Sequence, residues 1–273
     1  AAGGGRRRGR PGDSTGGGRS ATLRRVMERF TLLRVIYLVA MVLIAQFLAT
    51  TLVAMLVYPG GTLFNPDADS YRFLQNTFSE LGRVYDFEGN PKPLSQWLFT
   101  VAMVLSGVGL MAAHAAFPGL FREAPRSSRI LSIVTGVLGA VVGLGFVGIG
   151  LFPTDVQTRA HYISVYFAFT GMLPAVATAA AALLQHPVVP RTAKAVHIAF
   201  LGVLLGYLWL LWFGPARETP TGAAIQVVGQ EVIVYVGVTA MAIQCGVAVN
   251  RLTRRLRSDQ EAAGTPGRIR ERS

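Results

Sequence analysis

The feature that most constrains the fold of this chain is a set of long apolar stretches. They lie at roughly 33–58, 96–117, 129–152, 161–185, 194–214 and 223–249. Each has the roughly 20 mainly apolar residues that a helix needs to cross a bilayer. Only 15% of the residues are charged, against about 25% in a typical soluble domain. The sequence therefore predicts an all-α fold, a polytopic membrane bundle of six transmembrane helices.

Composition divides the chain into three parts. Residues 1–30 are rich in Gly and Arg and predict a disordered cytoplasmic tail. Residues 31–252 form the predicted membrane domain, and 253–273 a basic cytoplasmic tail. The net charge is +12, but most arginines lie in the tails or beside apolar stretches, where charges set membrane topology. We therefore expect no nucleic-acid partner.

Charge alternates from one connection to the next. The tails and the second and fourth connections are basic, whereas acidic side chains outnumber basic ones in residues 59–95: Asp67, Asp69, Glu80, Asp86 and Glu88. Because positive charge is retained on the cytoplasmic side, both termini are expected to be cytoplasmic. The predicted location is the plasma membrane, with 59–95 on its outer side.

The first outer connection has a helical period. Tyr71, Leu74, Phe78 and Leu81 form one apolar stripe within 69–83. This spacing predicts an amphipathic helix in the first outer loop. Such a helix would lie flat in the membrane interface or cover the mouth of the bundle.

Several polar residues of types used in catalysis and ligand binding belong to the same outer side. The candidate catalytic residues are Ser79, Glu80 and His161, because a histidine base beside a hydroxyl or carboxyl group can drive catalysis. The candidate ligand-binding residues of the outer connections are Arg83, Asp155 and Arg159. The guanidinium groups of Arg83 and Arg159 are suited to hold a phosphate or carboxylate. Solvated faces, helix caps and a boundary histidine are the structural alternatives.

Two further ligand-binding candidates, Gln230 and Glu231, lie inside the last apolar stretch. Glu231 is about nine residues into the span, hence about 13 Å deep at about 1.5 Å per residue. An ionisable residue at such a depth is a functional candidate. A structural alternative is a protonated carboxyl that bonds between helices. We expect an outward-opening polar pocket that ends at Glu231.

The third apolar stretch contains small residues four apart, such as Gly139 and Gly143. This spacing lets helices approach closely in lipid. It predicts either tight packing within the bundle or self-association of two copies. The expected partners are therefore membrane lipids and, through this stretch, another membrane protein or a second copy.

No cofactor or metal is expected. No phosphate-binding loop follows a strand, and a lone cysteine, Cys245, makes no metal site. Ceramidase-like membrane hydrolases place a Ser, an Asp and three His around zinc. This chain has four His, of which only His161 is placed near the outer side. A zinc site is therefore not predicted.

Short motifs carry a family resemblance. "SELG" at 79–82, "GLFPTD" at 150–155 and the following His161 resemble the bacterial and archaeal membrane family called "domain of unknown function 998". The resemblance covers roughly 33–250. It departs at "GQE", 229–231, where the family often has Gly followed by Arg. It implies an integral membrane protein of about six helices and no assigned activity.

Three functions remain open on the sequence. The first is an accessory protein that binds a lipid or small amphiphile in an outward-opening pocket. The second is a membrane-embedded hydrolase or transferase acting on a lipid or polyprenyl substrate. The third is a proton-coupled transporter that uses Glu231. No internal repeat of the kind common in transporters is evident.

Overall fold

The computed structural model describes residues 14–263, which fold into a bundle of long helices with no β-strand among them. The helices are α1 (Ser14–Leu56), α2 (Phe78–Leu81), α3 (Pro93–Ala116), η1 (Phe117–Phe121), α4 (Arg126–Leu151), α5 (Thr158–Leu184), α6 (Arg191–Phe213) and α7 (Pro220–Ala263). Six of them are long and apolar enough to cross a membrane. The predicted all-α membrane bundle is confirmed, and the chain is a multi-pass membrane protein.

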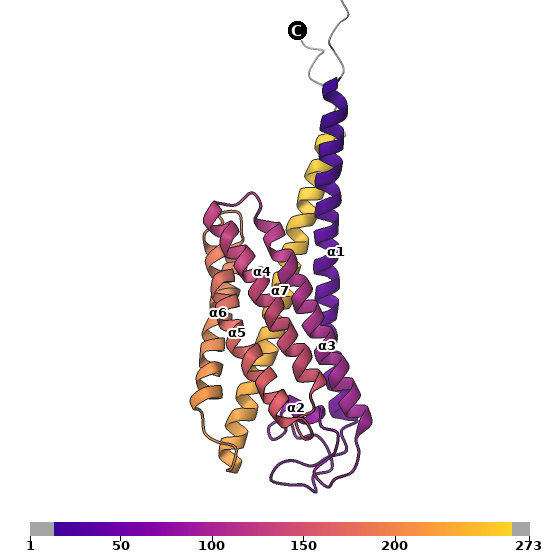
Figure 1. Cartoon of the computed structure of the whole chain (residues 1–273), viewed down its shortest axis with the longest axis vertical. Helices are drawn as coiled ribbons and strands as arrows, with labels where there is room; N and C mark the ends of the chain where they lie inside the picture. The colour runs from indigo at the N-terminus through magenta and orange to yellow at the C-terminus, as the bar shows by residue number, and fades with distance from the viewer. Residues whose placement is uncertain (1–13, 264–273) are drawn as a thin grey trace, which may run out of the picture.

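The helices pack mostly in chain order. α1 packs on α3, α3 on α4, α4 on α5, α5 on α6 and α6 on α7, and α7 returns to pack on α1. α1 and α7 project together beyond one end of the bundle, which we call the terminal side (Figure 1). The opposite end carries α2 and the connection 57–92, and we call it the loop side.

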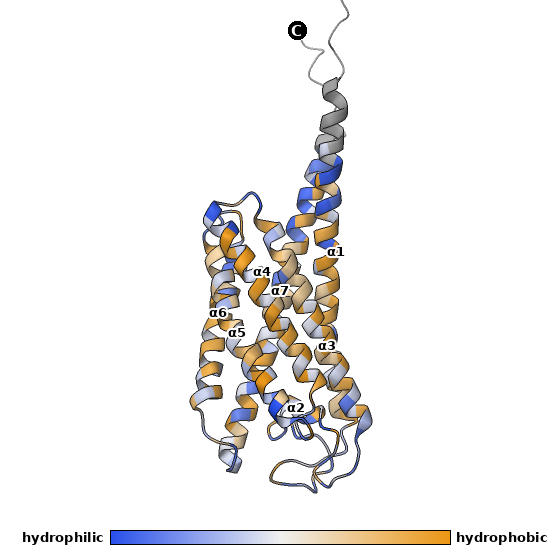
Figure 2. Cartoon of the chain, in the orientation of Figure 1, coloured by the Kyte–Doolittle hydropathy of each residue, from blue (hydrophilic) through white to orange (hydrophobic). Residues whose placement is uncertain are grey.

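Apolar side chains cover the outside of the bundle. Trp209, Phe213 and Leu56 are each more than half exposed, as expected where lipid rather than water surrounds a helix. Apolar residues run along the long helices, and hydrophilic residues gather where α1 and α7 project (Figure 2). The outer surface thus matches a membrane environment.

On the terminal side, two helices extend further than the sequence predicts. α1 begins at Ser14, inside the predicted disordered tail, and α7 continues to Ala263, inside the predicted basic tail. The extensions pack on each other, because Phe30 and Leu33 share one apolar cluster with Leu252 and Leu256. The sequence of either tail alone does not predict this burial, because each tail supplies the other's packing partner. Residues 1–13 and 264–273 of the predicted tails lie outside the described residues.

The helix on the loop side is shorter than predicted. Only Phe78–Leu81 is helical, in place of 69–83. Asn76 explains the difference, because its side-chain oxygen accepts the main-chain N–H of Arg72 at 2.8 Å. Such a side-chain bond competes with helix formation. Thr77 then has an extended backbone and begins α2.

α2 covers the bundle and does not lie flat in the interface. Phe78 and Leu81 are buried in the main apolar cluster, and Tyr71 packs against it. The fourth residue of the predicted stripe, Leu74, is 61% exposed. The stripe therefore splits into an inward-facing part and an exposed turn.

The small residues of α4 serve packing within the bundle. A Cβ atom on Gly143 would lie 2.7 Å from the main-chain oxygen of Gly107 on α3, and the converse distance is also 2.7 Å. On another face, a Cβ atom on Gly145 would lie 2.8 Å from Cβ of Ala168 on α5. Glycine thus lets α4 approach both neighbours closely.

Candidate functional site

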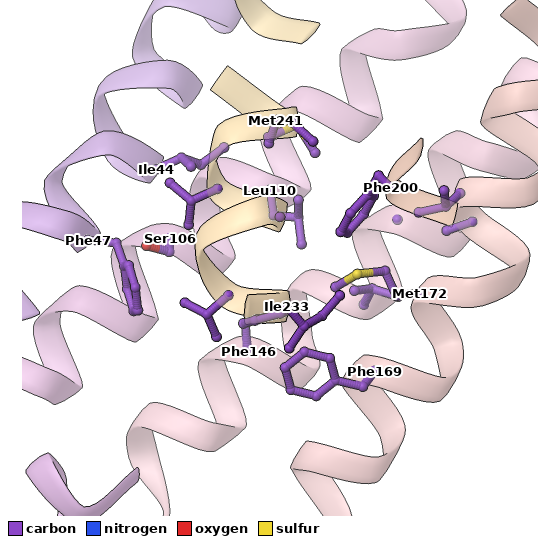
Figure 3. A pocket seen from close by; sticks show the side chains of 18 of the residues that line it. Ile44, Phe47, Ser106, Leu110, Phe146, Phe169, Met172, Phe200, Ile233 and Met241 are labelled. Atoms are coloured by element: carbon purple, nitrogen blue, oxygen red, sulfur yellow. The ribbon is translucent and has the colours of Figure 1, made fainter. Parts of the chain in front are cut away.

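A cavity of about 150 Å³ lies in the centre of the bundle. α1 and α3–α7 all contribute to its wall, and Phe78 and Ser79 of α2 line its loop side. Phe146, Phe169, Met172, Phe200 and Ile233 converge on the same space (Figure 3). Their side chains are entirely apolar. Apolar cavities of this size accept apolar molecules.

The cavity is long and narrow. On α7 its wall runs from Gln230 to Gln244, which is about 21 Å along the helix at about 1.5 Å per residue. If the cavity volume of about 150 Å³ is spread evenly over that length, the mean cross-section is only about 7 Å². This shape fits one extended hydrocarbon chain better than a compact ring system.

Polar residues occur mainly at the two ends of the wall. The polar lining residues are Ser79 and Gln230 at the loop end, Ser106 midway, and His114, His197 and Gln244 at the terminal end. His114 Nδ1 lies 2.9 Å from the main-chain oxygen of Leu110, and Gln244 Nε2 contacts His197 Nδ1. The terminal-end polar groups therefore bond within the protein.

At the loop end, a histidine and a serine are in contact. His161 Nε2 on α5 lies 3.0 Å from Ser79 Oγ on α2. His161 Nδ1 lies 2.7 Å from the main-chain oxygen of Phe152. Because a carbonyl oxygen only accepts, Nδ1 carries the proton, and Nε2 is left to accept from the serine hydroxyl. Two of the three catalytic candidates are thus brought together.

The third catalytic candidate, Glu80, holds α2 in place. Its Oε1 lies 2.8 Å from Arg217 in the α6–α7 connection, and its side chain is 5% exposed. Its Oε2 accepts from Asn76 Nδ2 at 2.7 Å and from the Thr77 N–H at 3.3 Å. Asn76 Nδ2 also donates to the main-chain oxygen of Gly61 at 2.9 Å. Glu80 is therefore committed to protein contacts.

Lys92 holds the other end of α2. Its Nζ donates to the main-chain oxygens of Glu80 and Leu81, each at 2.8 Å, and lies 4.8 Å from the ring centre of Tyr58. Carbonyls in the last turn of a helix have no partner within that helix, so Lys92 supplies one. Burial, with a smaller contribution from the charge of Arg83, lowers the pKa of the Lys92 ammonium from 10.5 to about 7.

The predicted ligand-binding residues of the outer connections do not line the cavity, and two of them bind the loop. Asp155 accepts the main-chain N–H groups of Val84 at 3.1 Å and Tyr85 at 2.9 Å. Arg83 donates to the main-chain oxygen of Tyr85 at 3.0 Å and lies over the Phe87 ring at 4.3 Å. Arg159 is exposed. None of these three candidates is part of the cavity wall.

The two candidates on α7 differ from each other. Gln230 lines the cavity, and its Oε1 accepts the Phe78 N–H at 3.0 Å. Glu231 is buried at 4% exposure, does not line the cavity, and has no hydrogen-bond partner for either carboxyl oxygen among residues 14–263. Burial raises the pKa of the nearby Tyr71 phenol, and a negative charge on Glu231 would raise that pKa further.

The cavity therefore differs from the expected polar pocket that ends at Glu231. Its wall is mostly apolar, and α2 lines its loop end. The physical reason is that most loop-side polar groups are used to fix main-chain groups of 57–92. A polar side chain that bonds the backbone is not free to line a pocket.

We call α2 the cap, and the contacts that hold it in place the cap network. Three residues of this network were not selected as candidates from the sequence: Asn76, Lys92 and Arg217. Asn76 had a signal, since it precedes a possible helix start in "NTFSEL". Arg217 lies 137 residues from Glu80 in the chain, so no local pattern links them.

Comparison with known proteins gives one match. Neither a search of curated proteins nor a search of solved structures finds a similar protein. Residues 52–244 match the model of the family described as "Protein of unknown function (DUF998)". The matched part includes α2, α3–α6 and the part of α7 that lines the cavity. Because this match covers more than half of the chain, the protein belongs to the DUF998 family of membrane proteins of unknown function.

Proposed function

We propose that this protein binds one hydrocarbon chain of a lipid or similar amphiphile inside the helical bundle. The central cavity carries this proposal, because it is long, narrow and walled mainly by apolar side chains. Empty apolar space within a packed bundle loses favourable contacts, and a hydrocarbon chain would restore them. The amphiphile's polar end would lie at Ser79 of α2 and Gln230 of α7, the polar residues at the loop end of the wall.

The cap gives this binding site a means of retention. α2 is fixed by Glu80 to the α6–α7 connection, and by Lys92 to the start of α3. An occupant would therefore leave only when these contacts open, or by passing between helices into lipid. Slow exchange of the bound chain is the expected consequence.

Native mass spectrometry of the protein in mild detergent tests the proposal. Gly237→Leu places a larger side chain in the cavity wall, where a Cβ atom has only the Phe200 ring near it, at 3.5 Å. Gly202→Leu is the matched control, because Gly202 is exposed on α6 and its Cβ position meets open space.

We expect wild type and Gly202→Leu to carry a bound amphiphile, and Gly237→Leu to lose at least nine-tenths of it. Equal retention in all three proteins would contradict the proposal, because the cavity would then play no part in retention. Detection of bulk detergent alone on the wild-type protein would also contradict the proposal.

We also propose that the loop side faces away from the cytoplasm in the plasma membrane. The positive-inside distribution of arginines supports this orientation. Single-cysteine labelling of intact cells tests it, because Cys245 is buried. A membrane-impermeant maleimide should label Glu88→Cys on the loop side and spare Arg126→Cys at the start of α4. The reverse pattern would overturn the orientation.

A further inference from the structure

We propose that Ser79 is a nucleophile and His161 its general base, and that the pair hydrolyses an ester of the amphiphile held in the cavity. This inference rests on the proposed function, because the cavity is what would bring the ester to Ser79. Its substrate class is an ester of a long-chain carboxylic acid. Ser79 would attack the carbonyl at the polar end of that chain.

The contact between the two side chains has the polarity that this chemistry needs. His161 Nδ1 faces the Phe152 main-chain oxygen at 2.7 Å and so holds the ring proton on that nitrogen. Nε2 is then the basic nitrogen, 3.0 Å from Ser79 Oγ. A nucleophile within hydrogen-bond reach of a base that a third group orients is the signature of an activated serine.

The pair lies at the place where a bound ester would end. Ser79 is in the cavity wall, while His161 is 2% exposed and is not part of the wall. The base is therefore shielded, and the serine is the member of the pair that lines the cavity. A surface serine and histidine in chance contact would not be arranged in this order.

Gln230 supplies a donor for the charge that develops on the carbonyl oxygen. Its Oε1 accepts the N–H of Phe78, the residue before Ser79. With the oxygen fixed in this way, the amide NH₂ is the group that remains for the cavity, which Gln230 also lines. A side-chain amide donor of this kind stabilises the oxyanion of acyl transfer.

The cap fixes the position of the nucleophile. Glu80, the residue after Ser79, is held by Arg217 at 2.8 Å. Lys92 holds the main-chain oxygens of Glu80 and Leu81 at 2.8 Å. Catalytic groups act efficiently when neighbouring contacts hold them in place. In this account Glu80, predicted as a catalytic candidate, acts instead with Arg217 and Lys92 to position Ser79.

The reaction balances with water as the second substrate. The Ser79 hydroxyl proton moves to His161 Nε2 as Oγ bonds to the carbonyl carbon. The bond from that carbon to the alcohol oxygen then breaks, and the alcohol takes the proton from Nε2. Water attacks the resulting acyl-serine, passing a proton to Nε2. Release of the carboxylic acid breaks the acyl–Oγ bond, and Ser79 regains the proton.

The test uses the whole protein in lipid nanodiscs with two readouts. The first is covalent labelling of Ser79 by a long-chain fluorophosphonate, located by peptide mass spectrometry. The second is release of p-nitrophenol from p-nitrophenyl palmitate. The variants are Ser79→Ala and His161→Ala. Ser128→Ala is the matched control, because Ser128 Oγ also ties two helices, through the Ala182 main-chain oxygen at 3.2 Å, without lining the cavity or contacting α2.

We expect wild type and Ser128→Ala to be labelled and to turn over the ester. Ser79→Ala should show neither, and His161→Ala should lose about 10²–10⁴-fold of the rate. Labelling elsewhere, or turnover that survives Ser79→Ala, would overturn the inference. So would absence of labelling and turnover in a folded wild type.

A contact that merely ties α2 to α5 gives a different result. Both variants at the pair would then lower the unfolding temperature, and no protein would be labelled. Retained amphiphile in the absence of labelling would leave the binding function standing and overturn the catalytic step. Labelling of Ser79 without any retained amphiphile would support the nucleophile and overturn the proposed binding function.

Discussion

The ion pair between Glu80 and Arg217 offers the sharpest test of the cap. The two side chains come from α2 and the α6–α7 connection and meet at 2.8 Å. If this pair holds the cap closed, then Glu80→Gln and Arg217→Gln should each increase opening of 57–92. Glutamine keeps the approximate shape of Glu80 while removing its charge.

The expected coupling energy follows from the geometry. Coulomb's law at 2.8 Å with an effective dielectric constant of about 20 gives an attraction of about 6 kcal/mol before desolvation. The Glu80 side chain is 5% exposed and that of Arg217 is 32% exposed, so burial of the carboxylate and water around the guanidinium offset most of this attraction. We expect a net coupling of about 1–2 kcal/mol, as for other hydrogen bonds to charged groups.

Hydrogen–deuterium exchange measures this coupling directly. The Gly82 and Arg83 amides donate to Ser79 and Glu80 main-chain oxygens, so their exchange reports opening of α2. Each single variant should accelerate exchange of these amides about 5- to 30-fold. The double variant should add little to either, giving a non-additive cycle. Fully additive effects, with coupling below about 0.3 kcal/mol, would refute the reasoning.

Three further changes test other parts of the structure. Lys92 has a pKa of about 7 in the fold against about 10.4 when unfolded, so the unfolded chain holds more protons between these values. Stability should therefore rise from pH 7 to about pH 10, and Lys92→Met should abolish that rise in the unfolding temperature. Gly107→Ala should destabilise the protein by about 1–3 kcal/mol, since the new Cβ atom would meet main-chain oxygen on α4 at 2.7 Å. Gly206→Ala, where nothing lies within 4 Å, should be neutral or stabilising by up to about 1 kcal/mol. Asp155→Ala should leave the Val84 and Tyr85 amides without their acceptor and raise their exchange about 5- to 30-fold. Unchanged exchange there would show that water replaces the carboxylate.

The membrane helices could be predicted because their signal is local. Length and apolar composition located all six, and prolines or charges marked their ends, as at Pro93 and Pro190. The predicted helix over 69–83 was wrong for a reason that is also local in space. That reason leaves no mark in the pattern of apolar residues. The Asn76 side chain bonds the Arg72 N–H and the Gly61 oxygen, which periodicity does not reveal.

The cavity could not be predicted from composition. In a soluble helix the buried face is apolar and the other polar, whereas in a membrane both faces are apolar. Ile233 lines the cavity and is 2% exposed, while Val232 beside it is 47% exposed. Their side chains are alike, so only packing distinguishes a wall residue from a lipid-facing one.

The candidate site could be predicted in part. Sequence reasoning placed Ser79 and His161 on one side of the membrane, and the structure joins them across 82 residues of chain. Sequence reasoning also predicted that Arg83 and Asp155 bind a ligand. In the structure both side chains bind the main chain of the loop. Most of the residues selected from the sequence are charged, yet the polar side chains at the loop end of the cavity are the uncharged Ser79 and Gln230.

Photo-crosslinking tests the central claim most directly, namely that the cavity holds a hydrocarbon chain. The probe is a long-chain fatty acid with a diazirine at the chain end, added to the protein in nanodiscs and irradiated. The account predicts crosslinks on cavity residues such as Met172, Ile233 and Met241, and their loss in Gly237→Leu. Crosslinks confined to outward-facing residues such as Leu205 and Trp209 would contradict it.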